Sequence, residues 1–227
     1  MSQPRAPRRR IAAPRSEQSG LADVHAAINK YYTAKVRKFG ATPYGVDWTC
    51  LPTQEMRFVQ LLKLCDFAAP FSLNDVGCGY GALVSYLDAR HADCAIDYLG
   101  LDLSPDMLRQ ARRLWRDRPN VTFAQGATSP RQADYSLASG IFNVQQDQPR
   151  EIWEMFVATT LHHLQRTSRR GFAVNFMRAP GPGRKERAGL YSTEPERWAS
   201  YCRGTFGAAT QMIENYGLRE FTLIARS

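Results

Sequence analysis

The apolar residues near the start of the chain recur with the period of a helix. Over residues 21–39 they fall at steps of three and four positions, with lysine and arginine on the other faces, which predicts an amphipathic helix. Gly40 follows at a position where helices often end. After a segment rich in turn formers, a second helix is predicted over residues 54–64. Residues 19–70 are therefore predicted to form a mainly helical segment.

From residue 71 onward, short apolar runs alternate with amphipathic stretches. The apolar runs predict strands, and the amphipathic stretches predict the helices that connect them. Ser104 and Pro105 mark one helix start, since serine is a favoured N-cap and proline suits the first helical position. The predicted strands cover residues 73–76, 98–103, 121–124, 135–138 and 171–177, and the other helices cover residues 82–90, 151–164 and 194–201.

The chain ends with two predicted strands in residues 209–227, around a turn at residues 215–217. Strands joined in this way form an antiparallel hairpin, whereas the strand–helix units before them require a mainly parallel sheet with helices on both faces. The predicted fold class is α/β: a seven-stranded, mainly parallel sheet with a C-terminal antiparallel hairpin and an N-terminal helical extension. We divide the chain into a tail (1–18), a helical cap on the substrate side (19–70) and a sheet domain (71–227).

Composition narrows the class of protein. With 227 residues, of which 44% are hydrophobic and 22% charged, the chain suits one α/β domain with an ordinary core. Its five cysteines are odd in number and contain no C-x-x-C, so we expect no metal site, no disulfide framework and a cytoplasmic location. No apolar run approaches the roughly 18 residues of a membrane span. The basic N-terminus lacks the apolar segment of a secretory signal.

The net charge of +9 is concentrated at one end of the chain. Residues 1–15 contain five arginines and no acidic residue, so these charges leave only +4 for the other 212 residues. A segment so rich in arginine and proline is predicted to be a disordered tail. The rest of the chain has too small a basic excess to indicate a nucleic-acid binder. We expect a small-molecule partner, and nucleic acid bound through the tail is the less favoured alternative.

A glycine-rich loop follows the first predicted strand. In NDVGCGYGAL (74–83), Gly77, Gly79 and Gly81 alternate with other residues. In open α/β sheets the first strand-to-helix turn lies at the crevice beyond the carboxyl ends of the strands, where ligands bind. Glycines let the backbone approach a ligand closely. We therefore expect this loop to cradle a cofactor.

The loop by itself fits two cofactors. Gly77, Gly79 and Ala82 satisfy the dinucleotide pattern G-x-G-x-x-G/A, and Asp102 lies 25 residues beyond Gly77, near the place of a ribose-binding acid. Three features favour S-adenosylmethionine (SAM) instead. Asp75 brings a carboxylate that suits an ammonium and a sulfonium but repels a pyrophosphate. In addition, about 70 residues precede the loop, and the sheet ends in a hairpin rather than in a second three-strand half.

Four segments resemble the motifs of class I SAM-dependent methyltransferases. DVGCGYG (75–81) resembles their D/E-x-G-x-G-x-G motif, and YLGLDLSPDML (98–108) resembles their second motif, with an acid at the end of the second strand. FAQGAT (123–128) and ADYSLASGIFN (133–143) resemble the third and fourth motifs. The resemblance covers about residues 70–227. The segments YYTAKVRKFGATPYGVDW, ASGIFNV and YGLREFTLIAR further resemble a bacterial subgroup of unknown substrate.

The resemblance implies where the cofactor binds. The glycine loop would meet the methionine part of SAM, with Asp75 near its amino-acid end, and Asp102 would accept both ribose hydroxyls with its two oxygens. The segment after Asp102 and the third motif would contact the adenine, and the end of the fourth strand would lie beside the transferred methyl. The implied residues are Asp75, Gly77, Cys78, Gly79 and Gly81; Asp102, Leu103 and Met107; Gly126 and Ala127; and Ser139 and Gly140.

The acceptor side is predicted to be built from segments outside the sheet. Aromatic residues near a SAM site stack on substrate or shield the sulfonium, and an arginine pairs with a carboxylate or phosphate. No catalytic base is assigned, because His162 and His163 fall far from the carboxyl ends of the strands. Substrate contacts are predicted for Tyr31, Tyr32, Trp48, Arg57 and Asn143, and for the loop around Tyr191.

The predicted function is methyl transfer from SAM to a small molecule or biosynthetic intermediate. Such a transfer is an in-line displacement, so positioning supplies much of the rate. Residues 139–142, SGIF, differ from the [N/D]-P-P-[Y/F/W] of amino-methylating DNA enzymes, which disfavours base methylation. The alternatives are an RNA or protein methyltransferase that uses the tail, a non-catalytic SAM-binding partner subunit and an NAD(P)-dependent oxidoreductase. The acceptor atom and the oligomeric state stay open.

Overall fold

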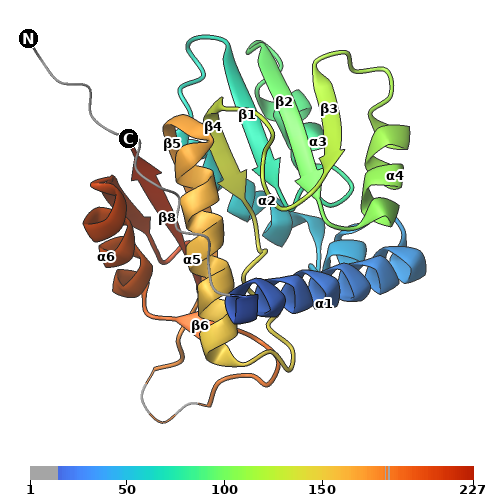
Figure 1. The fold of residues 1–227 in the computed structure, drawn as a ribbon. Coiled ribbons are helices and arrows are strands. Elements are labelled where there is room, and N and C mark those ends of the chain that lie inside the picture. Colours follow the sequence, from blue (N-terminus) through green and yellow to red (C-terminus); the bar gives the residue numbers. More distant parts are fainter. Residues whose placement is uncertain (1–14, 182, 184) are drawn as a thin grey trace, which may run out of the picture.

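Eight strands form one sheet in the part of the chain that the computed structural model describes, residues 15–181, 183 and 185–227. They are β1 (Phe71–Val76), β2 (Ile96–Asp102), β3 (Val121–Gln125), β4 (Ala133–Ala138), β5 (Ser168–Arg178), β6 (Ser192–Thr193), β7 (Ala209–Ile213) and β8 (Glu220–Arg226). The order is β3-β2-β1-β4-β5-β8-β7, and β6 pairs with β5 outside this path (Figure 1). Only the pairs that β8 makes, with β5 and β7, are antiparallel in this described sheet. The predicted α/β class and terminal hairpin are confirmed.

The strand order reverses beside β1. This strand lies between β2 and β4, with Leu73 paired to Tyr98 on one side and to Tyr135 on the other. Because the connections on the two sides of β1 leave in opposite directions, a crevice opens at the carboxyl ends of these strands. The glycine loop begins at this crevice.

The helices follow the predicted periodicity. Local signals explain one start well: the Ser104 hydroxyl accepts a hydrogen bond from the N–H of Met107 at 3.3 Å, and Pro105 is the first residue of α4. None of the described helices has the length and apolar character needed to cross a membrane. The helices are α1 (Arg15–Phe39), α2 (Leu51–Leu61), α3 (Ala82–Arg90), α4 (Pro105–Leu114), α5 (Arg150–Arg166) and α6 (Pro195–Phe206), with short 3-10 helices η1 (Pro43–Val46) and η2 (Leu62–Leu64).

The number of strands and several element bounds differ from the sequence predictions; α2, for example, begins at Leu51, and α6 continues to Phe206. The sheet has eight strands rather than seven, because β6 consists of two residues and is too short to show a period. Helix α1 begins at Arg15, six residues before the predicted start, because it continues into polar residues that carry no apolar period. The predicted tail covers residues 1–18. Residues 1–14 lie outside the described part of the chain, and residues 15–18 belong to α1.

Two apolar clusters arrange the helices in layers. Helices α5 and α6 pack on one face of the sheet around Trp153 and Trp198, and α2 and α3 pack on the other around Phe58 and Leu83. All four side chains are buried, and each contributes about 2 kcal/mol or more through the apolar area it removes from water. The sheet is therefore covered on both faces, which leaves its ends as places for a ligand.

Helix α1 lies across the carboxyl ends of the strands instead of on a face of the sheet (Figure 1). Its buried Val24 joins the cluster around α5. Further along, Thr33 Oγ1 lies 2.7 Å from Ser104 Oγ, and Arg37 Nε donates to Asp106 Oδ2 at 2.5 Å. These contacts with the start of α4 hold α1 in place above the crevice.

Candidate active site

The loop after β1 places backbone amides at the crevice. The N–H groups of Gly77 and Cys78 both donate to the carbonyl of Leu101 on β2, at 2.8 and 2.9 Å, and hold the loop against the neighbouring strand. Gly77 has a φ of +79°, and a Cβ at this position would lie 2.2 Å from Cγ2 of Ile141. Glycine alone meets both conditions. The motif therefore reflects backbone conformation and close packing at the edge of the crevice.

Asp102, the last residue of β2, connects this loop to α4. Its Oδ2 accepts a hydrogen bond from the N–H of Gly79 at 2.9 Å, and its Oδ1 accepts one from the N–H of Ser104 at 2.8 Å. The removal of water around it raises the pKa of Asp102 to about 6, against the opposing effect of backbone hydrogen bonds. The carboxylate thus has a fixed position between the glycine loop and the start of a helix.

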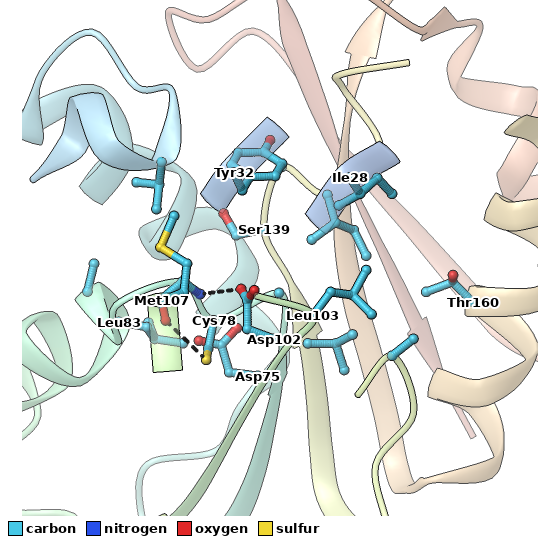
Figure 2. A pocket seen from close by; sticks show the side chains of 18 of the residues that line it. Ile28, Tyr32, Asp75, Cys78, Leu83, Asp102, Leu103, Met107, Ser139 and Thr160 are labelled. Atoms are coloured by element: carbon cyan, nitrogen blue, oxygen red, sulfur yellow. Dashed lines mark hydrogen bonds between the residues drawn. The ribbon is translucent and has the colours of Figure 1, made fainter. Parts of the chain in front are cut away.

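Asp75 lies near Asp102 at the same end of the sheet (Figure 2). It is 3% exposed and accepts a hydrogen bond from the hydroxyl of Tyr98 at 2.6 Å. Burial raises the pKa of Asp75 to about 7, the Tyr98 hydrogen bond lowers it, and the charge of Asp102 raises it again. Two carboxyl groups with raised pKa values form a place where a cationic ligand stabilises the ionised forms.

These carboxyl groups line an inner pocket with a volume of about 930 Å³, its open mouth included. Figure 2 shows Asp75, Cys78 and Asp102 gathered on one side of the pocket, and Tyr32 and Ile28 of α1 on another. The pocket brings together eleven of the twelve predicted cofactor residues: Asp75, Gly77, Cys78, Gly79, Asp102, Leu103, Met107, Gly126, Ala127, Ser139 and Gly140.

Gly81 is the predicted cofactor residue that does not line the pocket. It precedes α3 with a φ of +81°, and a Cβ there would lie 2.6 Å from Nε1 of Trp115. That indole N–H donates to the carbonyl of Tyr80 at 3.1 Å. The third glycine of the motif therefore allows close packing of the loop against Trp115 at the end of α4.

Other lining residues had no signal in the sequence. Phe58 comes from α2, and Phe156 and Thr160 come from α5, so only tertiary packing brings them to the inner pocket. Ile28 is different, because it lies four residues before Tyr32 in α1 and shares its helix face. That spacing was a usable signal for Ile28.

A second, outer pocket adjoins the first and has a volume of about 1350 Å³, its open mouth included. The two pockets share Tyr32, Val46, Trp48 and Gly140. A Cβ on Gly140 would lie 2.3 Å from Cζ2 of Trp48, so the indole packs directly on the backbone beyond β4. This contact forms the boundary between the pockets. The predicted acceptor residues Tyr32, Trp48, Arg57 and Asn143 all line the outer pocket.

Two residues predicted on the acceptor side contact other parts of the protein. Tyr31 lines neither pocket, and its hydroxyl donates to Oδ2 of Asp47 at 2.6 Å. Tyr191 is fully buried, and its hydroxyl accepts a hydrogen bond from Nε1 of Trp198 at 3.0 Å, although the residues on either side of it line the outer pocket. Both tyrosine hydroxyls are therefore hydrogen-bonded within the protein, and the residue type alone does not reveal this in a sequence.

Arg57 is predicted to pair with a substrate anion, but it pairs with Glu220 of the same chain. Its Nε and Nη2 donate to Glu220 at 2.8 and 2.6 Å, and the two side chains are only 7% and 6% exposed. The guanidinium also lies 3.8 Å from the ring centroid of Trp48. Glu220 accepts from Nδ2 of Asn175 at 2.7 Å, and Oδ1 of Asn175 accepts from the N–H of Gly140 at 2.7 Å. Contacts through Arg57, Glu220 and Asn175 therefore connect Trp48 to Gly140, the residue on which its indole packs.

Two polar atoms beside the pocket boundary lack a partner among the described residues. They are Oγ of Ser139 and Oδ1 of Asn143, and both atoms are buried. Ser139 lines the inner pocket and Asn143 lines the outer one. Because buried polar atoms in proteins are nearly always hydrogen-bonded, these two atoms are open to hydrogen bonds from water or from a bound ligand.

The raised pKa of Asp75 leads to a prediction about stability. The folded protein holds the Asp75 proton more tightly than the unfolded chain does, so this group favours folding at low pH, and the contribution is lost as pH rises through about 7. Relative to an Asp75→Asn variant, we expect the wild type to lose about 2 kcal/mol of unfolding free energy between pH 5 and pH 8. Urea unfolding of both proteins at the two pH values measures it. If the difference in unfolding free energy between the two proteins is the same at pH 5 and pH 8, the raised pKa of Asp75 is contradicted.

Comparisons with known proteins agree with this geometry. Residues 74–183 match a family model described as a methyltransferase domain. The chain is 40% identical over 165 residues to "Putative methyltransferase Rv1506c" of Mycobacterium tuberculosis, which covers 73% of this chain and 98% of that protein.

Two solved structures share the fold at low sequence identity. Magnesium protoporphyrin IX methyltransferase from Synechocystis PCC 6803 with bound S-adenosylhomocysteine (SAH) has a TM-score of 0.60 at 17% identity, over 90% of this chain and 98% of that one. N-methyltransferase NodS from Bradyrhizobium japonicum WM9, in complex with SAH, has a TM-score of 0.61 at 14% identity, over 88% and 96%. The glycine loop, the paired acids, the strand order and the 40% identical relative together show that this chain belongs to the class I methyltransferases, which are enzymes that use SAM as cofactor.

Proposed function

We propose that the protein transfers a methyl group from SAM in the inner pocket to a small molecule in the outer pocket. The observation that carries this proposal is the boundary that the two pockets share at Tyr32, Trp48 and Gly140. A methyl group has to pass from one ligand to the other in line, so the two binding sites must meet at one point. Residues 19–70 form the cap on the acceptor side, since α1, α2 and the segment between them supply the aromatic wall.

The inner pocket fits SAM in charge and in hydrogen bonding. Asp75 and Asp102 complement its ammonium and sulfonium charges, and Ser139, whose hydroxyl has no hydrogen-bond partner among the described residues, lines the same pocket. When bound, SAM supplies a methyl group that is electrophilic because it is attached to a sulfonium. In our assignment Asp102 accepts the ribose hydroxyls, and Leu103 and Met107 contact the adenine. The remaining assigned contacts are the loop residues Gly77, Cys78 and Gly79 for the methionine part, Gly126 and Ala127 for the adenine edge, and Ser139 and Gly140 for the methyl side.

An acceptor pocket with its own unpartnered polar group favours an active enzyme over a non-catalytic SAM-binding subunit. Asn143 lines that pocket, and its buried Oδ1 has no hydrogen-bond partner among the described residues. An RNA or protein acceptor would instead depend on the arginine-rich tail. Binding of such a polymer would be strongly salt-dependent, and the dependence would disappear on deletion of residues 1–15.

Calorimetric titration of the full chain with SAM, SAH and NADH tests the cofactor site. We expect SAM and SAH to bind with dissociation constants in the micromolar range, because both share the ribose and amino-acid groups that the inner pocket complements. At pH 8, where Asp75 and Asp102 are ionised, NADH should give no heat of binding, since these carboxylates repel its pyrophosphate. Tight NADH binding without a response to SAM would refute the proposal.

A further inference from the structure

We propose that the acceptor is a small carboxylic acid and that one oxygen of its ionised carboxylate receives the methyl group, which makes a methyl ester. The inference rests on the proposed function and names its substrate class. It is supported by the basic side chains that line the outer pocket and by the lack of a proton-accepting group among the described residues at the pocket boundary.

The acidic groups of the outer pocket each lie beside a basic group of the same chain. Each of the three carboxylates that line it forms an ion pair with a basic side chain of the same chain. The pairs are Asp47 with Lys35 at 2.5 Å, Glu186 with Arg150 at 3.6 Å, and Glu220 with Arg57 at 2.6 Å.

The basic groups of the outer pocket are in excess. Arg57 and Arg178 have partners, since Arg178 pairs with Glu214 at 2.6 Å. Lys185, Arg187 and Arg219 also line the pocket, and none of them forms an ion pair within the described residues. Two of these cations come from the segment before β6 and the third directly precedes β8. Their position around one pocket favours an anionic ligand.

The pocket boundary supplies no group suited to remove a proton from an acceptor. Among the described residues, no histidine or cysteine lines the outer pocket, and its carboxylates are held in the ion pairs above. The hydroxyl of Tyr32 lies at the boundary, but burial raises the pKa of Tyr32 well above its ordinary value, so it stays protonated. An alcohol, ammonium or thiol acceptor has to lose a proton during methylation and gains from a base, whereas an ionised carboxylate has none to lose.

The step balances without a base. One oxygen of the acceptor carboxylate forms a bond to the methyl carbon, and the bond from that carbon to sulfur breaks with its electron pair kept by sulfur. A carboxylate anion and a sulfonium become a neutral ester and a neutral thioether, and no proton is released. The amide of Asn143 lines the outer pocket, and its NH₂ is a hydrogen-bond donor. It would donate to the second carboxylate oxygen.

Alkali distinguishes this product from other methylated compounds. The full chain is incubated with SAM carrying a tritiated methyl group and a panel of aliphatic and aromatic mono-, di- and tricarboxylic acids, beside matched alcohols and amines. Methyl esters release volatile methanol in alkali, whereas methyl ethers and methylamines keep their label. We expect alkali-labile label with acids and none with the alcohols and amines. If SAM binds and only alkali-stable label appears, or no acid is labelled, the carboxylate assignment is overturned; failure of SAM binding would instead refute the proposed function.

Binding of the acids provides a readout that does not depend on turnover. Citrate, succinate and benzoate are titrated into the protein saturated with SAH. We expect at least one of them to bind, and Arg219→Gln to weaken that binding about tenfold or more, because a charge-assisted hydrogen bond is lost. The matched control is Arg116→Gln, an exposed arginine that pairs with Asp117 and lines neither pocket; it should bind as the wild type does. No binding by any of the three acids, or equal affinity in the two variants, would overturn the anion site.

Discussion

Replacing Asp102 by alanine is expected to weaken SAM binding by about 100-fold or more. In our assignment its two oxygens accept both ribose hydroxyls, and a hydrogen bond to a charged group contributes about 1.5–3 kcal/mol. Two such bonds correspond to a loss of about two to four factors of ten. The variant also frees the N–H of Gly79, which the carboxylate now holds at 2.9 Å. Calorimetric titration with SAM measures the change.

A matched control removes an acid from the same strand without touching the pocket. Asp97 lies at the other end of β2 and pairs with Arg131 at 2.6 Å on the surface. Asp97→Ala should bind SAM within about twofold of the wild type, since surface pairs contribute little. An Asp102→Ala protein that unfolds normally in urea and still binds SAM like the wild type would refute the assignment of this residue.

The isosteric variant adds a pH test of the same residue. The pKa of Asp102 is raised to about 6 in the protein without cofactor, so the affinity of the wild type for SAM should fall as pH drops below about 6, where the carboxylate takes up a proton. Asp102→Asn cannot ionise, so its weaker binding should lack this contribution to the pH dependence. Titrations between pH 5 and pH 8 compare the two proteins, and parallel pH profiles would contradict the prediction.

Replacing Glu220 by alanine is expected to reduce the free energy of unfolding by about 3–5 kcal/mol. The change leaves the guanidinium of Arg57 charged and buried, with side-chain exposure of 7%, and without its carboxylate partner. It also removes the acceptor for Nδ2 of Asn175, which lies 2.7 Å from Glu220. Urea unfolding of the variant and the wild type measures the loss.

A double variant separates the ion pair from general damage to the core. Arg57→Met combined with Glu220→Leu replaces both charges by apolar groups, so it should lose much less stability than the sum of the two single changes. The surface control is Glu196→Ala, which removes the exposed partner of Arg203 on α6 and should cost less than about 1 kcal/mol. Losses that add in the double variant would show that Arg57 and Glu220 act independently, against the structure.

The residues that sequence reasoning located well obey short-range rules. The glycine loop, Asp102 and the Ser104–Pro105 start of α4 lie within about thirty positions of one another, and each follows from a turn, a strand end or a helix cap. Eleven of the twelve cofactor residues implied by the resemblance line one pocket. Four of them, Gly126, Ala127, Ser139 and Gly140, were found through the match to family motifs rather than through a short-range rule. Gly81 does not line the pocket, because a glycine needed for packing against Trp115 and a glycine needed beside a ligand look the same in a sequence.

The sequence by itself predicted the α/β class from its periodicity. It favoured SAM through Asp75, the terminal hairpin and the resemblance of four segments to methyltransferase motifs. Only the tertiary structure decided what the acceptor side is made of. Arg57 and Glu220 are 163 positions apart, and no local pattern indicates that they form a buried pair under Trp48. The same holds for Lys185, Arg187 and Arg219, which have no ion-pair partner among the described residues because each carboxylate that lines the outer pocket pairs with another basic side chain. Long-range pairing depends on how the layers pack, and packing leaves no periodic trace in the chain.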